Sequence, residues 1–263
     1  MQHTEGGFGR ITLRAAAQYD TMLPTPQGHE GGTMMFFWDW TYILVIPGLL
    51  LGLWAQARVQ STYAKYSRVG TRLGRPASEV VDDLLRRNGN GRVSIGRVNG
   101  QLTDHYDPAH ETLNLSTGVY GSSSVAALGV AAHEAGHAMQ KFEGYTPLKL
   151  RTAAVPIVNI GSSMATPIFI AGLIFAWEPL VNVGILLFSL SVIFALITLP
   201  VEFNASSRAV QMLTEGGYVT GEEEQGVRKV LNAAALTYVA AAVTSLLSLL
   251  RLLIIAGRNQ NRR

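Results

Sequence analysis

The residues best suited to chemistry lie in the run Ala131–Met139, which reads AAHEAGHAM. It contains His133, Glu134 and His137 in the spacing H-E-x-x-H. On a helix, side chains four residues apart share one face, so both imidazoles can reach one metal ion with the carboxylate beside them. Neutral imidazole binds Zn²⁺, which lowers the pKa of its bound water toward ~7, and a carboxylate that does not bind the metal can accept a proton from that water. The pattern predicts a zinc hydrolase helix with Glu134 as the general base.

The alternative for so short a pattern is an ordinary amphipathic helix that carries two surface histidines. The flanking residues are small or apolar, from Val130 to Ala132 and again at Ala138 and Met139. They describe a helix that is packed on most sides, where unpaired His and Glu side chains would be costly. The flanks therefore favour a metal site.

A catalytic zinc usually keeps three protein ligands and one water, so the two histidines need a partner. The chain contains no cysteine, which excludes thiolate ligands. Glu143 stands where a metzincin places its third ligand, but the glycine that breaks the helix in that pattern is replaced by Gln140. Glu202 is the better candidate, because a predicted membrane hairpin returns it to the side of the zinc helix.

Long apolar runs divide the 263 residues into membrane and non-membrane parts. A mean hydropathy of +0.21 with 15% charged residues indicates a mixed architecture. Several runs reach the ~20 apolar residues that a transmembrane helix needs. The predicted organisation is a disordered tail at 1–35, transmembrane helix 1 at 36–57, a zinc metallopeptidase domain at 58–152, a transmembrane hairpin (helices 2 and 3) at 153–200, a third-ligand helix and loop at 201–232, transmembrane helix 4 at 233–257 and a basic tail at 258–263.

The segment before the zinc helix predicts a small α+β domain. Apolar residues at helical spacing after Pro76 indicate a helix that ends at Asn88-Gly89. Strands are predicted at 92–98 and 112–116, with a hairpin turn at Asn99-Gly100. The zinc helix follows, from about Ser124 to Phe142. Two strands before an H-E-x-x-H helix are typical of zincins, so the predicted fold class is an α+β zincin-like metallopeptidase domain embedded in a mainly helical integral membrane protein with about four transmembrane helices.

Further short motifs follow one another in order along the chain. They include Ile46-Pro47-Gly48, Leu102–Pro108, the zinc helix and Thr198–Phe203. On these motifs the chain resembles the YugP-like membrane-bound zinc metallopeptidases, relatives of the HtpX and CAAX-prenyl-protease-type gluzincins, over almost everything from Phe37 to Gly257. The resemblance implies one Zn²⁺ per chain, with His133 and His137 as ligands, Glu134 as general base and Glu202 as third ligand.

Two positions depart from the patterns of these relatives. The HtpX-type pattern has an Asp four residues after the third ligand, which orients a zinc histidine, whereas this chain has Ser206. The Ser206 hydroxyl, or the carboxylate of Asp104 or Asp107, is a candidate for that role. Asn204 stands where the YugP-like pattern has Asp, which puts a charged role there in doubt.

The polar segment Asp104–Asp107 is predicted to lie in a turn after a strand. One interpretation is that His105 or Tyr106 donates to the oxyanion formed during hydrolysis. The other, equally weighted, is a solvated turn held by Asx hydrogen bonds. Arg208 is a lesser candidate for the same oxyanion role, and the preferred interpretation is a surface or lipid-headgroup contact.

These patterns together predict a membrane-anchored zinc endopeptidase that hydrolyses peptide bonds. Its partners would be a peptide or protein substrate, membrane proteins included, and the lipid bilayer. Basic residues that flank the membrane spans explain the net charge of +3. The sequence has no basic stripe interleaved with aromatic residues, so we expect no nucleic-acid partner. The alternatives are a catalytically idle membrane scaffold or partner-binding subunit and, ranked lower, a site-2-type intramembrane protease.

The expected location is the cell membrane, with several crossings. Basic residues flank the spans on the zinc side, whereas Trp177-Glu178-Pro179 carries no Lys or Arg. The positive-inside rule then places the zinc domain in the cytoplasm. Arginines 258, 262 and 263 count against this orientation if the last span crosses completely.

Overall fold

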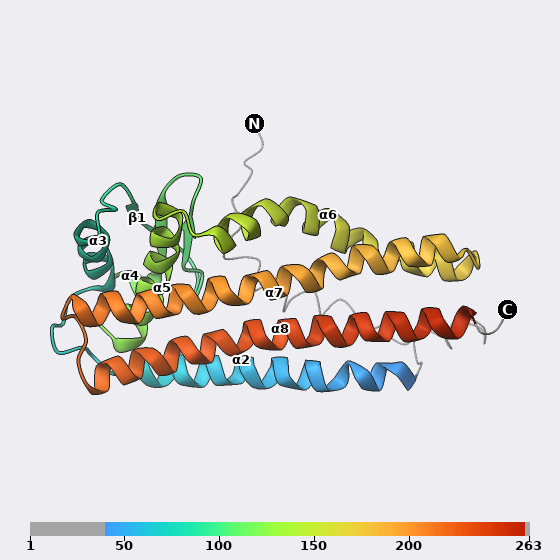
Figure 1. Cartoon of the computed structure of the whole chain (residues 1–263). Coiled ribbons are helices and arrows are strands. Elements are labelled where there is room, and N and C mark those ends of the chain that lie inside the picture. Colours follow the sequence, from blue (N-terminus) through green and yellow to red (C-terminus); the bar gives the residue numbers. More distant parts are fainter. Residues whose placement is uncertain (1–39, 261–263) are drawn as a thin grey trace. The chain divides into compact units, whose positions relative to one another are not determined.

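The computed structural model describes residues 40–260, so the predicted disordered tail at 1–35 and the last three residues of the basic tail lie outside the described part of the chain (Figure 1). The described chain is mainly helical with one small sheet. Its elements are the 3₁₀ helix η2 (Trp40–Leu44), helices α2 (Ile46–Tyr66) and α3 (Ala77–Arg87), strands β1 (Ser94–Val98), β2 (His105–Asp107) and β3 (Thr112–Ser116), and helices α4 (Thr117–Tyr120), α5 (Val125–Phe142), α6 (Thr146–Ile174), α7 (Glu178–Glu215) and α8 (Glu222–Gln260).

The described chain divides into two compact units. The first contains residues 57–145 and 201–235, and the second contains residues 40–56, 146–200 and 236–260. Since α2, α7 and α8 contribute to both units, three of the four unit boundaries in the described chain fall inside helices.

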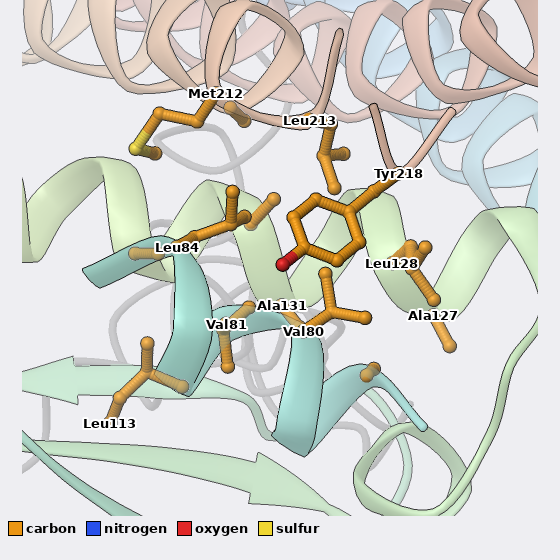
Figure 2. Packing of buried hydrophobic residues seen from close by; sticks show 14 of the residues in the cluster. Val80, Val81, Leu84, Leu113, Ala127, Leu128, Ala131, Met212, Leu213 and Tyr218 are labelled. Carbon is orange, nitrogen blue, oxygen red and sulfur yellow. The ribbon is translucent and has the colours of Figure 1, made fainter. Parts of the chain in front are cut away.

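The core of the first unit forms around α5, whose start at Ser124 agrees with the prediction. The Ser124 hydroxyl accepts a hydrogen bond from the Ala127 amide, which satisfies one of the unpaired donors of the first turn. Apolar side chains of α3, β3, α5, α7 and the loop after α7 pack together in one cluster (Figure 2). The predicted helix after Pro76 is confirmed as α3, which contributes the fully buried Val80, Val81, Leu84 and Leu85.

The three-stranded sheet has the order β1-β3-β2, and this corrects the predicted hairpin at Asn99-Gly100. Strands β1 and β3 are parallel, and the antiparallel partner of β3 is β2. The segment predicted as a turn at 104–107 is therefore mostly a strand. The reason lies in two aspartates: Asp104 accepts bonds from the amide and hydroxyl of Ser116, and Asp107 accepts bonds from the amides of Ala109 and His110. The bonds to Asp104 hold the start of β2 at the end of β3, and the bonds to Asp107 form the turn of the hairpin that joins β2 and β3.

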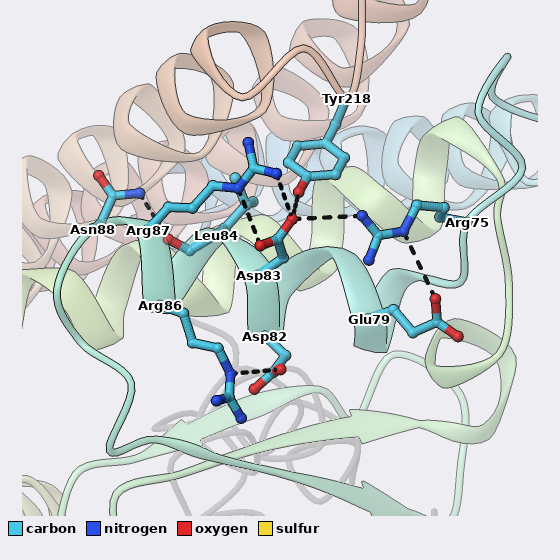
Figure 3. A network of polar contacts seen from close by, with 9 residues as sticks. All are labelled: Arg75, Glu79, Asp82, Asp83, Leu84, Arg86, Arg87, Asn88 and Tyr218. Carbon is cyan, nitrogen blue, oxygen red and sulfur yellow. Dashed lines mark hydrogen bonds and ion pairs between the residues drawn. The ribbon is translucent and has the colours of Figure 1, made fainter.

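A polar network ties α3 to the loop between α7 and α8 (Figure 3). The Asp83 carboxylate accepts hydrogen bonds from the hydroxyl of Tyr218 and from the guanidinium groups of Arg87 and Arg75. The Tyr218 hydroxyl, followed by Arg87, lowers the pKa of Asp83. Both guanidinium groups also lie 5.7 Å from the centre of the Tyr218 ring, so the ring is held between two cations.

Four helical segments of the described residues are long and apolar enough to cross a membrane, in agreement with the predicted number. They are Trp40–Tyr66, Thr146–Ile174, Glu178–Glu215 and Glu222–Asn259. Large apolar side chains on them are left exposed by the protein, among them Leu50 at 59%, Ile160 at 70% and Leu186 at 64%. Large apolar side chains left exposed on a long helix are what a lipid-facing helix presents.

All four helices continue beyond the predicted spans. α2 runs to Tyr66 and α6 already begins at Thr146. α7 passes through Pro200 without ending, and α8 already begins at Glu222. A hydropathy pattern shows where the apolar composition ends, which is a different property from the end of the helix. The predicted third-ligand helix is therefore the last part of α7, continuous with a candidate span.

Candidate metal centre

Helix α5 places His133 and His137 one turn apart, with Glu134 beside them, as the H-E-x-x-H spacing requires. The two imidazole rings meet edge to face, with centroids 4.8 Å apart and planes at 84°. Most of the other positions in the helix are fully buried small or apolar residues, such as Ala131, Ala135 and Ala138. The interpretation as a helix packed on most sides is confirmed, and the polar side chains lie on its one remaining face.

Helix α7 approaches α5 so closely that one glycine is required between them. A Cβ atom placed on Gly136 would lie 2.5 Å from the carbonyl oxygen of Ala205, which is closer than real Cβ atoms come to any heavy atom. Val201, Ala205 and Ala209 are fully buried and follow one another at four-residue spacing on α7. The close contact brings the turn that carries Glu202 against the turn between the two histidines.

Three possible ligand atoms therefore meet at one point. The Nε2 atoms of His133 and His137 lie 3.2 Å and 3.6 Å from Oε2 of Glu202, and the ligand atoms of all three residues lie within 4.8 Å of one another. Ligands bound tetrahedrally to zinc at ~2.0–2.1 Å are about 3.3 Å apart, so the two measured separations suit one shared ion. Glu202 is only 3% exposed, and a cation would compensate its buried charge. The donor set fits zinc.

The Glu134 carboxylate lies beside this cluster and is oriented by strand β2. Its Oε2 accepts a hydrogen bond of 2.9 Å from the backbone amide of Tyr106. Burial raises the pKa of Glu134, His133 and the Tyr106 amide lower it, and Glu202 and Asp104 raise it; the net result is a pKa of about 7. A cation at the neighbouring ligands would favour the ionised carboxylate.

Both histidines have a polar partner at the other ring nitrogen. Ser206 Oγ lies 3.2 Å from Nδ1 of His133. Gln140 Oε1 lies 3.0 Å from Nδ1 of His137, and the Gln140 side chain is fully buried. Sequence reasoning missed Gln140 because it considered position 140 only for the absence of a glycine. The available signal was a polar residue three positions after a candidate ligand in an otherwise apolar helix.

The candidate oxyanion donors are occupied elsewhere. Nδ1 of His105 lies 2.9 Å from the carbonyl of Thr103, and Nε2 lies 3.2 Å from the side-chain amide of Asn114. The Tyr106 ring is 5% exposed and belongs to the core, so this residue reaches Glu134 with its backbone amide only.

The two aspartates proposed as supports of a zinc histidine serve the sheet. Both carboxylate oxygens of Asp104 accept bonds from Ser116, and burial raises the pKa of Asp104 against the effect of these bonds. Asp107 binds the His110 ring at 2.6 Å in addition to the turn amides. Of the two interpretations of the segment, the Asx-bonded turn describes Asp107.

The rival third ligand, Glu143, is engaged in an ion pair. Its two carboxylate oxygens each lie 2.8 Å from a terminal guanidinium nitrogen of Arg208. Among the described residues, the cluster able to hold a metal contains Glu202 and not Glu143. Arg208, interpreted as a surface or headgroup contact, binds Glu143 in an exposed ion pair and also donates to the side chain of Asn204.

Comparison with known proteins decides the family. A family model described as "Putative neutral zinc metallopeptidase" matches residues 41–257. The chain belongs to this family. The "Putative membrane protease YugP" of Bacillus subtilis (strain 168) is 48% identical over 220 residues, which are 83% of this chain and 98% of that relative. The resemblance to the YugP-like family is therefore confirmed. No solved structure matches the chain.

Proposed function

We propose that this protein is a membrane-anchored zinc endopeptidase of the HExxH-plus-Glu type with a zincin-like catalytic domain. The observation that carries the proposal is the meeting of His133, His137 and Glu202 at zinc-ligand spacing, with the Glu134 carboxylate beside them. These three residues hold one Zn²⁺ per chain. When bound, the ion supplies Lewis-acid chemistry, since it acidifies a water and polarises a carbonyl oxygen.

Glu134 moves the proton in the proposed reaction. Its carboxylate takes a proton from the attacking water and then gives it to the amine that leaves the broken peptide bond. Burial raises the pKa of this carboxyl group and a cation at the neighbouring ligands lowers it, so the group is suited to accept and to release a proton near neutral pH. The hydrogen bond from the Tyr106 amide holds one carboxylate oxygen, which leaves the other for the water.

The substrate is proposed to be an extended segment of a peptide or protein, membrane proteins included. Strand β2 lies at an edge of the sheet, and its middle residue, Tyr106, contacts the catalytic carboxylate. An extended chain that adds to this edge through main-chain hydrogen bonds would pass directly beside Glu134. The four candidate spans would anchor the enzyme in the cell membrane, with the zinc domain in the cytoplasm.

The test is the Glu134→Gln variant of the full chain, purified in detergent and compared with Glu215→Gln, an exposed glutamate at the end of α7. The carboxamide can still accept the bond from Tyr106 but cannot act as a base. We expect one zinc per chain in all proteins, and a loss of ~10²–10⁴-fold in cleavage of an unstructured protein by Glu134→Gln alone. Zinc-loaded wild type that cleaves nothing would favour the scaffold.

A further inference from the structure

Four side chains form a continuous chain of hydrogen bonds that ends on His137. We call it the Gln140 chain, and its members are Gln140, Asn204, Arg208 and Glu143. The Gln140 side-chain nitrogen donates to the carbonyl of Val201 at 2.8 Å and to Oδ1 of Asn204 at 2.9 Å. Asn204 Oδ1 also accepts from Nε of Arg208 at 2.8 Å, and Arg208 pairs with Glu143.

The orientation of each side-chain amide in this chain is fixed by a neighbouring group that can only donate or only accept a hydrogen bond. A backbone carbonyl can only accept, so the Gln140 atom that faces Val201 must be its nitrogen. A guanidinium can only donate, so the Asn204 atom that faces Arg208 must be its oxygen. That oxygen is also the atom that receives the second N–H of Gln140. Both N–H groups of Gln140 therefore meet an acceptor.

The orientation of Gln140 determines the protonation of His137. With its nitrogen committed to Val201 and Asn204, Gln140 presents its oxygen to Nδ1 of His137 at 3.0 Å. Nδ1 must then carry the proton, and the lone pair of the neutral ring is left on Nε2. Nε2 is the atom that lies 3.6 Å from Glu202.

We propose that Gln140 is a positioning residue that holds His137 in the tautomer and ring orientation needed to bind zinc through Nε2, and that Asn204 and the Arg208–Glu143 pair hold Gln140 in turn. The inference rests on the proposed function, because it assigns the ligand role to His137. It accounts for a fully buried glutamine in an apolar helix and for Asn204, whose oxygen is the only part of the amide that the chain uses.

The experiment compares four variants of the full-length protein in detergent. Gln140→Leu removes the acceptor that faces His137, and Asn204→Leu removes the support behind it. Asn204→Asp keeps an oxygen for both Gln140 and Arg208. Gln211→Leu is the matched control, because this exposed glutamine on α7 contacts Glu215 at the end of the helix. The readouts are zinc affinity by competition with a chelator and the histidine ¹⁵N NMR signals of metal-free protein.

Gln140→Leu should bind zinc ~10–100-fold more weakly, as expected for the loss of a partner that orients a ligand. Asn204→Leu should weaken zinc binding in the same direction and less, while Asn204→Asp and Gln211→Leu should match the wild type. The wild-type His137 signal should show a proton on Nδ1, and Gln140→Leu should show a mixture of tautomers. A purely structural role for Gln140 would not change the tautomer.

The proposal is overturned if folded Gln140→Leu binds zinc like the wild type, or if wild-type His137 carries its proton on Nε2. If Gln140→Leu does not fold, the Asn204 pair decides: equal zinc affinity in Asn204→Leu and Asn204→Asp overturns the proposal, and a difference supports it. Zinc affinity and tautomer are measured without substrate. Failure to cleave would therefore count against the endopeptidase and leave this inference standing.

Discussion

At the scale of single residues, the two histidines of the centre are held unequally. The bond from His137 to Gln140 has one possible direction, because the other bonds of Gln140 fix its amide. His133 faces the hydroxyl of Ser206, which can donate or accept and therefore fits either tautomer. The bonds of Gln140 thus hold the proton of His137 in place, whereas the Ser206 hydroxyl does not by itself select a tautomer of His133, whose Nε2 lies 3.2 Å from Glu202.

The identity of the third ligand can be tested with two carboxylates. Glu202→Ala should lose most bound zinc and all activity, because Glu202 is buried against both histidines. Glu143→Ala should keep its zinc with only a small loss of affinity, because it leaves all three ligands in place and removes the outermost member of the Gln140 chain, an exposed ion pair of small energy. Metal content of the purified proteins is the measurement, and full occupancy in Glu202→Ala with an empty site in Glu143→Ala would contradict the assignment.

A smaller effect is expected at Ser206. Ser206→Ala should keep zinc bound but weaken its affinity by about tenfold, at the low end for a group that orients a ligand, because a neutral hydroxyl at 3.2 Å is a modest partner. Ser207→Ala is the matched control, since its neighbouring side chain is exposed. Chelator competition measures both, and equal affinities would mean that the Ser206 hydroxyl has no part in holding His133.

The sequence predicted those residues whose spacing along one helix determines the geometry. His133, Glu134 and His137 follow from the helical repeat alone. Gln140 could not be predicted in the same way, because its partners Val201 and Asn204 are more than sixty residues away and lie on another helix. Its role depends on a contact between helices that local periodicity does not describe.

At the scale of elements, the centre depends on how closely α5 and α7 approach each other. Gly136→Ala would place a methyl group 2.5 Å from the carbonyl oxygen of Ala205. Because that oxygen belongs to the backbone, the clash can be relieved only if the backbone moves. We expect the two helices to separate and zinc affinity to fall by at least tenfold, since the ligands lie on both sides of this contact. Gly121→Ala, with open space around the new methyl, is the control and should bind zinc normally. Normal zinc binding by Gly136→Ala would show that the close contact is dispensable.

The sheet shows what local patterns miss at this scale. The strands at 92–98 and 112–116 were predicted from alternation; the second exists with the predicted limits and the first is shortened to Ser94–Val98. Their parallel pairing was not predicted, because β2 takes the antiparallel position beside β3, where the bonds from Ser116 to Asp104 hold its start. Asn99-Gly100 has the composition of a hairpin turn, but the chain continues from there to the opposite edge of β3.

The network around Asp83 predicts a dependence of stability on pH. The pKa of Asp83 is lowered in the folded protein, so its ionised form stabilises the fold above the ordinary pKa of Asp, and this contribution is lost as the pH falls through the folded value. Asp83→Asn should therefore unfold more readily than the wild type at pH 7, by about 1 kcal/mol. The difference should shrink below about pH 4. Thermal unfolding at several pH values is the measurement, and a constant difference would show that the charge of Asp83 is not responsible.

At the scale of the whole molecule, hydropathy predicted the number of spans but not the length of the helices. Lipid selects for apolar side chains only within ~30 Å, while a helix continues as long as its backbone bonds do. Helix α7 is the clearest case, because one continuous helix contains both a candidate span and Glu202. A candidate metal ligand and a candidate span therefore belong to the same continuous helix.

The last prediction concerns the side of the membrane on which the centre lies. If α6 crosses the membrane once, the loop that follows β1 and the link before α7 must lie on opposite sides. The natural chain has no cysteine, so a single introduced thiol reports on one position. Gln101 and Phe175 are both exposed and represent the two sides. The basic flanks predict that an impermeant thiol reagent added to intact cells labels Phe175→Cys and leaves Gln101→Cys unlabelled until the cells are opened. The reverse pattern would place the zinc domain outside the cytoplasm, and labelling of both positions in intact cells would mean that α6 does not span.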